Sequence, residues 1–196
     1  MRKLLLTIWL IALLFSACQK KPSESGGFNI LSTDDTKEAV DLINDANSDL
    51  KKIKAIYKDN MGKTVELKAA MSNKENEKVK EIAGNLVTEI DNGVTLGESA
   101  YQKIEKAKEL NINETYKQYL DMKSEALRKQ LEAFEYRRKS AILLRDSFGG
   151  KEQKDLEVTK AKFKELDDNF QKLMEEGRTL SQDANELAKE AAKSKQ

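Results

Sequence analysis

Apolar residues recur every three or four positions along most of the chain after residue 32. A spacing of seven places residues on one helix face, because seven residues complete about two turns. This pattern predicts a helix over residues 33–72, or a helix broken at Asn60–Met61–Gly62. One series of seven-residue steps is Ile43, Leu50, Tyr57, Thr64 and Met71, and the other is Ala39, Ala46, Ile53, Asn60 and Leu67.

Similar series predict two more helices, over residues 75–110 and 113–147. In the first, Asn92–Gly93 offers an alternative break. Its series are Val79, Leu86, Gly93, Ala100 and Ala107, and Ala83, Ile90, Gly97 and Ile104; the second helix has Leu120, Leu127, Phe134, Ala141 and Phe148.

The most regular pattern lies in residues 152–192, which alternate steps of three and four and so predict a coiled-coil seam. The seam residues are Leu156, Thr159, Phe163, Leu166, Phe170, Leu173, Gly177, Leu180, Ala184, Leu187 and Ala191. Because heptads are common to bundles in general, this seam does not separate a monomer from a homo-oligomer that pairs along it.

Polar turn signals separate these segments. Ser32 with Asp35, and Ser72 with Glu75, fit capping boxes, and Asn113 fits an N-cap. The four segments have similar lengths and short connections, which place neighbours antiparallel. The predicted fold is therefore all-α: an elongated antiparallel up-down-up-down four-helix bundle with coiled-coil-like packing, occupying residues 32–196.

Composition argues against several functions. The chain has 35 Lys and Arg against 34 Asp and Glu, so its net charge of +1 gives no electrostatic reason to expect nucleic acid. It has no His, which removes the commonest general base and metal ligand, and one Cys, which cannot form an intramolecular disulfide. The segment "GVTLG" at 93–97 lacks the lysine of a phosphate-binding loop. We expect no enzymatic activity, cofactor or metal.

The first seventeen residues have the pattern of a secretory signal. Arg2 and Lys3 supply the positive start, and Leu4 to Phe15 form an apolar run that is short for a membrane-spanning helix. The run ends in Phe15-Ser16-Ala17-Cys18, which resembles the lipobox of bacterial lipoproteins, although these usually carry Leu where this chain has Phe15.

The resemblance implies cleavage before Cys18 and acylation of that cysteine, with palmitate among the chains, which would hold the protein on a lipid bilayer in the cell envelope. In lipoproteins of the enteric type, Asp directly after the cysteine retains the protein at the inner membrane. This chain has Gln19 there, so the resemblance implies the outer membrane if the cell has one, and otherwise the outer face of the cytoplasmic membrane. Residues 18–31 are then the lipidated cysteine and a tether that contains Pro22, two Ser and two Gly.

Two groups of residues in the helical region are candidate sites. Gly93, Gly97 and Ala100 place small residues on one helix face. This face is expected to permit close approach of residues 152–192, with Phe163 or Phe170 filling the space; a helix break and a groove for a ligand or partner are the alternatives. Glycine inside a helix costs about 1 kcal/mol against Ala, so a compensating contact is expected.

The second group, Lys123, Gln130 and Arg137, forms a polar row beside an apolar seam. These side chains either extend along the edge of the core, with their charged ends in water, or form an interaction surface. Arg137–Arg138–Lys139 is a short basic cluster that could contact anionic lipid or an acidic partner.

Together these patterns favour a membrane-anchored lipoprotein that acts as a non-catalytic helical scaffold or protein-interaction module, with an envelope protein as partner. The alternative is a lipid-anchored protein that binds a small ligand or metal inside the bundle.

Overall fold

The computed structural model describes residues 35–148 and 156–193, and all regular structure in these two ranges is helical. The helices are α1 (Thr36–Ser72), α2 (Asn76–Glu109), α3 (Glu114–Phe148) and α4 (Leu156–Lys193). The all-α prediction is confirmed. The signal, Cys18 and the tether lie outside the described residues.

None of the described helices carries a stretch long and apolar enough to cross a membrane.

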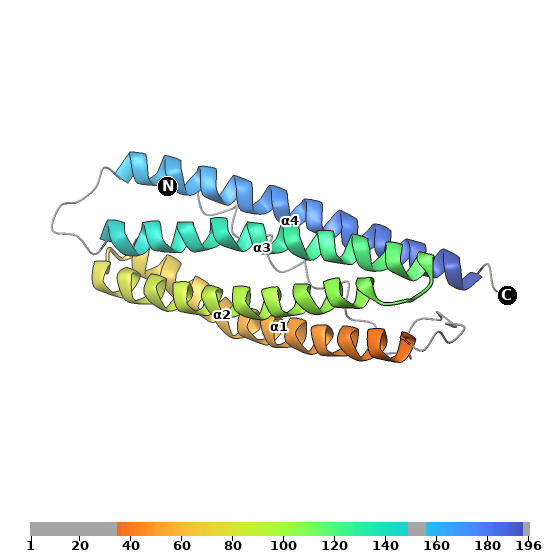
Figure 1. Ribbon diagram of the computed structural model, residues 1–196. Coiled ribbons are helices and arrows are strands. Elements are labelled where there is room, and N and C mark those ends of the chain that lie inside the picture. The colour runs from red at the N-terminus through yellow and green to blue at the C-terminus, as the bar shows by residue number, and fades with distance from the viewer. Residues whose placement is uncertain (1–34, 149–155, 194–196) are drawn as a thin grey trace.

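Each helix packs against the helices that precede and follow it in the chain. In Figure 1 each helix lies beside the preceding one and runs back along it. The packed pairs are α1–α2, α2–α3 and α3–α4, whereas the backbones of the remaining helix pairs come close at few points or none. α1 and α4 are therefore the outer helices, each with one extensive helical neighbour.

The two glycine-containing segments where breaks were considered are both helical. α1 continues through Asn60–Met61–Gly62, and α2 continues through Asn92–Gly93. Ile53 and Leu67, on either side of Gly62, are both buried. Burial on both sides offsets the helical cost of glycine, because tertiary packing contributes more to helix stability in proteins than intrinsic propensity does.

The turn between α1 and α2 differs from the sequence prediction. Ser72 is the last residue of α1 and does not cap α2, so the Ser72–Glu75 capping box is wrong. Lys74 takes a left-handed conformation, with φ at 59°, and the Glu75 N–H then donates to the Ala70 carbonyl at 2.9 Å. Backbone N–H groups of the turn thus donate to carbonyls at the end of α1 that have no partner within the helix. A left-handed residue after a helix usually makes such bonds possible.

The other two predicted caps have different outcomes. The Tyr116 N–H donates to Asn113 Oδ1 at 2.8 Å, which confirms Asn113 as the N-terminal cap of α3. Asp35 makes no capping bond to α1. Its carboxylate instead accepts the backbone N–H of Asn111 at 3.0 Å and so ties the start of α1 to the α2–α3 turn. Ser32 lies outside the described residues.

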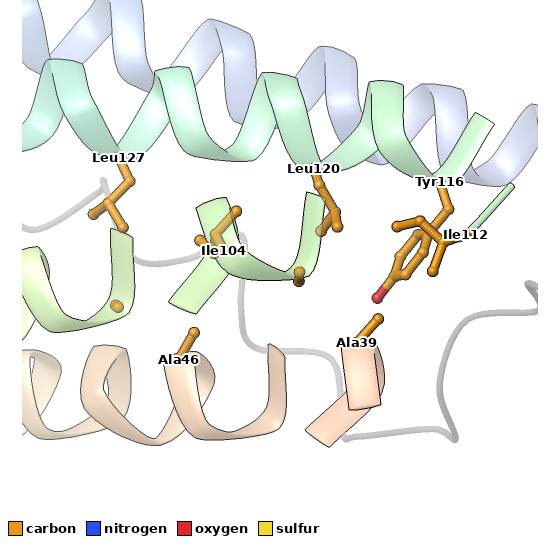
Figure 2. Close-up of a cluster of buried hydrophobic side chains, with 9 residues drawn as sticks. Ala39, Ala46, Ile104, Ile112, Tyr116, Leu120 and Leu127 are labelled. Atoms are coloured by element: carbon orange, nitrogen blue, oxygen red, sulfur yellow. The ribbon is translucent and has the colours of Figure 1, made fainter. Parts of the chain in front are cut away.

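Three helices share the buried cluster drawn in Figure 2, in which α3 supplies the large side chains and α1 supplies alanines. The larger side chains of α1, Leu42, Ile43 and Leu50, are partly buried and pack against the cluster. The cluster consists of Ala39, Ala46, Ala100, Ile104, Ala107, Ile112, Tyr116, Leu120 and Leu127.

At the opposite end, side chains from all four helices meet. Leu67 of α1, Val79 of α2 and Leu144 of α3 form part of one buried cluster, and Phe163 of α4 packs against it. A third cluster, centred on Phe170, lies between α3 and α4.

Candidate functional site

The small-residue face of α2 lies inside the fold. Gly93, Gly97 and Ala100 are all buried. A Cβ built on Gly97 would lie 2.6 Å from Leu131 Cδ2 of α3 and 3.8 Å from Ile53 Cδ1 of α1, whereas a Cβ on Gly93 would meet nothing within 4 Å. The contacts at Gly97 are contacts between packed helices, and they compensate for the propensity cost of a glycine at this position.

The helix that approaches this face is not the one expected from the sequence. Phe163 packs against the cluster of Leu67 and Val79, and Phe170 packs against Ala133 of α3. The expectation that α4 fills the space at Gly93 and Gly97 is therefore wrong. Seven-residue spacing defines a face of a helix but not which other helix meets it.

The closest approach of α4 occurs at its own glycine. A Cβ on Gly177 would lie 2.8 Å from the carbonyl oxygen of Ala126 and 3.1 Å from Gln130 Cγ on α3. Both contacts are shorter than ordinary van der Waals separations, and one involves backbone. Gly177 is therefore the position where α3 and α4 require a residue without a side chain.

Lys123, the first residue of the predicted polar row, faces α4. Its ammonium group donates to Ser181 Oγ and Asn185 Oδ1, both at 2.9 Å, and lies 5.5 Å from the centroid of the Tyr119 ring. Gln130, the second residue of the row, packs beside Gly177.

Arg137, the third residue, meets a buried carboxylate. Its Nη1 lies 3.4 Å from Asp167 Oδ1, and its guanidinium lies 5.4 Å from the Phe170 ring centroid. Burial raises the pKa of Asp167 above its usual value, and the charge of Arg137 opposes that rise. All three residues of the row thus belong to the α3–α4 interface.

A second polar seam joins α2 to α3. Arg138 Nε donates to Asp91 Oδ1 at 2.5 Å, and nearer the other end Ser124 donates to Glu105. Lys108 bridges Glu105 and Asp121, at 2.8 Å to each. Later residues of α2 pair with earlier residues of α3, so the seam keeps one register over most of both helices. Arg138, from the predicted basic cluster, belongs to this seam.

Asp49 of α1 is a buried charge that sequence reasoning did not single out. Its side chain is 6% exposed and accepts hydrogen bonds from Ser99 at 2.9 Å and Lys103 at 2.5 Å, both on α2, and from Lys52 at 3.1 Å. The bond from Lys103 lowers the pKa of Asp49 to about 2, with smaller contributions from Lys52 and Ser99 opposing the effect of burial. The sequence signal is weak: Asp49 lies seven residues after Leu42 and seven before Ile56, but the next members of this series, Asp35 and Lys63, are charged.

Tyr116 is the other strongly perturbed group. Burial raises its pKa to about 12, with a further contribution from Tyr119, whose ring stacks on it at 5.9 Å between centroids. Its position in the cluster of Figure 2 makes it a core residue with a polar end.

The polar residues described above form pairs, most of them between helices. Among the described residues, no three His, Cys, Asp or Glu side chains are grouped so as to hold a metal. A hollow of about 460 Å³ in that part of the chain is open to solvent. It is lined by Glu77, Lys80, Glu81, Gly84, Asn85 and Arg145. It lies on an earlier part of α2 than Gly93 and Gly97, and four of its six lining residues are charged, whereas small-molecule sites are usually lined mostly by apolar side chains.

Comparisons with known protein families, with curated proteins and with solved structures found no match to this chain.

Proposed function

We propose that this protein is a membrane-anchored lipoprotein of the cell envelope that acts as a non-catalytic helical scaffold or protein-interaction module. Acylation of Cys18 would hold it on the outer membrane, or on the outer face of the cytoplasmic membrane in a cell without one. The lipobox-like Phe15-Ser16-Ala17-Cys18 supports the anchor.

One structural observation favours a scaffold over an enzyme or a carrier. Three charge pairs join different helices: Asp49 with Lys103, Asp91 with Arg138, and Arg137 with Asp167. Catalytic and ligand-binding groups usually converge on a cavity, whereas these groups fix the alignment of long helices. The arrangement suits a rigid spacer.

The helical arrangement in this proposal is an elongated up-down-up-down bundle. Its support is the nearest-neighbour packing, the constant register of the α2–α3 seam, and the four-helix cluster around Leu67, Val79 and Leu144. At about 1.5 Å per residue, the longest helix, with 38 residues, would span roughly 57 Å.

Replacing Cys18 with Ser tests the anchor. The variant is expected to leave the membrane fraction and to lack acyl mass by mass spectrometry. Retention of the acyl mass in Cys18→Ser would disprove lipidation at this residue.

Crosslinking of the lipidated protein in envelope membranes, followed by pull-down, tests the scaffold. A stoichiometric protein partner is expected. A co-purifying small ligand without any protein partner would support the carrier alternative instead.

A further inference from the structure

The outward face of α1 carries an unusual concentration of lysine. Residues 51–68 contain six lysines and two acidic residues, Asp59 and Glu66. Lys52 pairs with Asp49 within α1, and Lys63 pairs with Glu89 of α2. The remaining four, Lys51, Lys54, Lys58 and Lys68, make no ion pair with any side chain that the structure describes.

These four lysines share one face. Steps of three and four residues place them on a stripe with Ala55, Gly62, Val65 and Ala69, which we name the basic stripe. Its members are exposed or half-buried, and Val65 is 67% exposed. The buried residues of the same part of α1, Ile53, Leu67 and Ala70, lie on the opposite side of the helix. Because α1 packs extensively on α2 alone, the stripe has no helix over it among the described residues.

Exposed lysines on α4 are arranged differently. Lys162 lies 2.8 Å from Glu165, Lys164 lies 2.8 Å from Asp168, and Lys172 lies 4.0 Å from Glu176. Each of these lysines has an acidic residue one helical turn away, so positive and negative charges nearly balance on this surface of α4. None of the four stripe lysines has an acidic residue three or four positions away, so the basic stripe is more positive than the surface of α4.

We propose that the basic stripe docks on an anionic phospholipid surface and holds α1 along the bilayer. The stripe extends for roughly 25 Å along α1 from Lys51 to Lys68 and has small residues between its charges. A flat array of lipid phosphates can meet all four ammonium groups at once. A protein partner usually requires aromatic or arginine anchors and pockets, and the stripe offers neither.

Chain length permits this orientation. Residues 19–34 separate Cys18 from the start of the described structure, and sixteen residues can reach roughly 50 Å when fully extended. The acidic Glu38 and Asp41 precede the stripe, so the contact would involve the middle and second half of α1. The proposal relies on the anchor of the proposed function only to bring α1 to the bilayer, because attraction of lysines to anionic lipid does not depend on acylation.

The test uses the full chain, purified from bacterial membranes and reconstituted into vesicles of phosphatidylcholine alone or mixed equally with phosphatidylglycerol. An amine-reactive reagent labels exposed lysines, and mass spectrometry reports each site. Labelling of Lys51, Lys54 and Lys58 is expected to fall several-fold on the anionic vesicles at low salt and to recover at high salt. Labelling of Lys162, Lys164 and Lys172 on α4 is expected to be the same on both.

Two variants of equal charge change give the matched comparison. Lys54→Glu with Lys58→Glu is expected to abolish the protection of Lys51, whereas Lys164→Glu with Lys172→Glu on α4 is expected to preserve it. Each stripe lysine removed should weaken binding to the anionic vesicles by about fivefold. Equal labelling of the stripe on both vesicle types overturns the proposal. Protection that appears only in native envelope membranes also overturns it, in favour of an acidic protein partner.

The outcome for the anchor is read separately. A protein without acyl mass that is still protected on anionic vesicles would overturn the proposed lipidation and leave the stripe's role standing. An acylated protein that remains on pure phosphatidylcholine but shows no stripe protection on the anionic vesicles would support the lipidation and overturn the proposed role of the stripe.

Discussion

Asp49 Oδ2 on α1 lies 2.5 Å from Lys103 Nζ on α2, so the buried carboxylate of Asp49 is paired across the α1–α2 interface. Lys103 is 28% exposed and Asp49 is 6% exposed, so the acid carries most of the desolvation. Truncating one member of such a pair leaves the other charge without its partner.

Asp49→Asn is expected to lower the free energy of unfolding near neutral pH by about 2 kcal/mol. Folding lowers the pKa of Asp49 from 3.8 to about 2, so the stabilisation is complete above pH 4 and disappears as the pH falls toward 2. Urea unfolding of both proteins across this range measures it. The difference between wild type and variant should shrink below pH 4, and a difference independent of pH would contradict the assignment. Lys52→Gln is a control expected to have a smaller effect, because Lys52 is 60% exposed.

Two helical glycines should respond to alanine in opposite directions. Gly62→Ala is expected to stabilise by up to about 1 kcal/mol, since a Cβ there meets nothing within 4 Å and alanine is the better helix former. Gly177→Ala is expected to destabilise by about 1–2 kcal/mol, because its Cβ would lie 2.8 Å from a backbone oxygen. Thermal unfolding measures both. A higher melting temperature for Gly177→Ala would show that α3 and α4 separate easily.

Lys123→Met is expected to weaken the α3–α4 interface by about 1 kcal/mol, through loss of the bonds to Ser181 and Asn185. Native-state hydrogen exchange should then be faster in α4 around residues 181–185. Lys117→Met, at another position on α3 for which no α4 contact is seen, is the matched control. Equal effects from both substitutions would count against a specific role for Lys123.

Tyr116→Phe is expected to reduce the loss of stability at alkaline pH. Folding raises the pKa of Tyr116 from 10.0 to about 12, so the neutral phenol is favoured in the fold. Stability from this group is complete below pH 10 and is lost as the pH rises toward 12. Chemical unfolding at increasing pH, with tyrosinate absorbance as a second signal, tests this. A wild-type titration near 10 would place Tyr116 in contact with water.

The helices could be predicted from the sequence because each one shows its buried face as a regular spacing of apolar residues within its own segment. The Asn113 cap is local as well, since its side chain bonds a backbone group three residues away. Ser72 does not act as a cap because the left-handed conformation of Lys74 gives the turn another set of hydrogen bonds. That conformation could not be predicted, because the turn contains no glycine to favour it.

The partners of each face could not be predicted in the same way. Gly97 meets Leu131 and Ile53, whereas the periodic pattern was equally compatible with Phe163. Lys123 and Arg137 bordered an apolar seam, but only packing reveals that α4 supplies their partners. Asp49 was not predictable with certainty, because only Leu42 and Ile56 flank it in steps of seven residues and the next positions, Asp35 and Lys63, are charged.

The nearest-neighbour packing of the helices also affects how the chain acquires its structure. Every extensive contact joins helices that are consecutive in the chain, so loops to be closed are short and contact order is low. A chain synthesised from its amino end can therefore close the α1–α2 hairpin before α3 is available, and add each later helix to a surface already formed. In such vectorial assembly α4 is the last helix to be added.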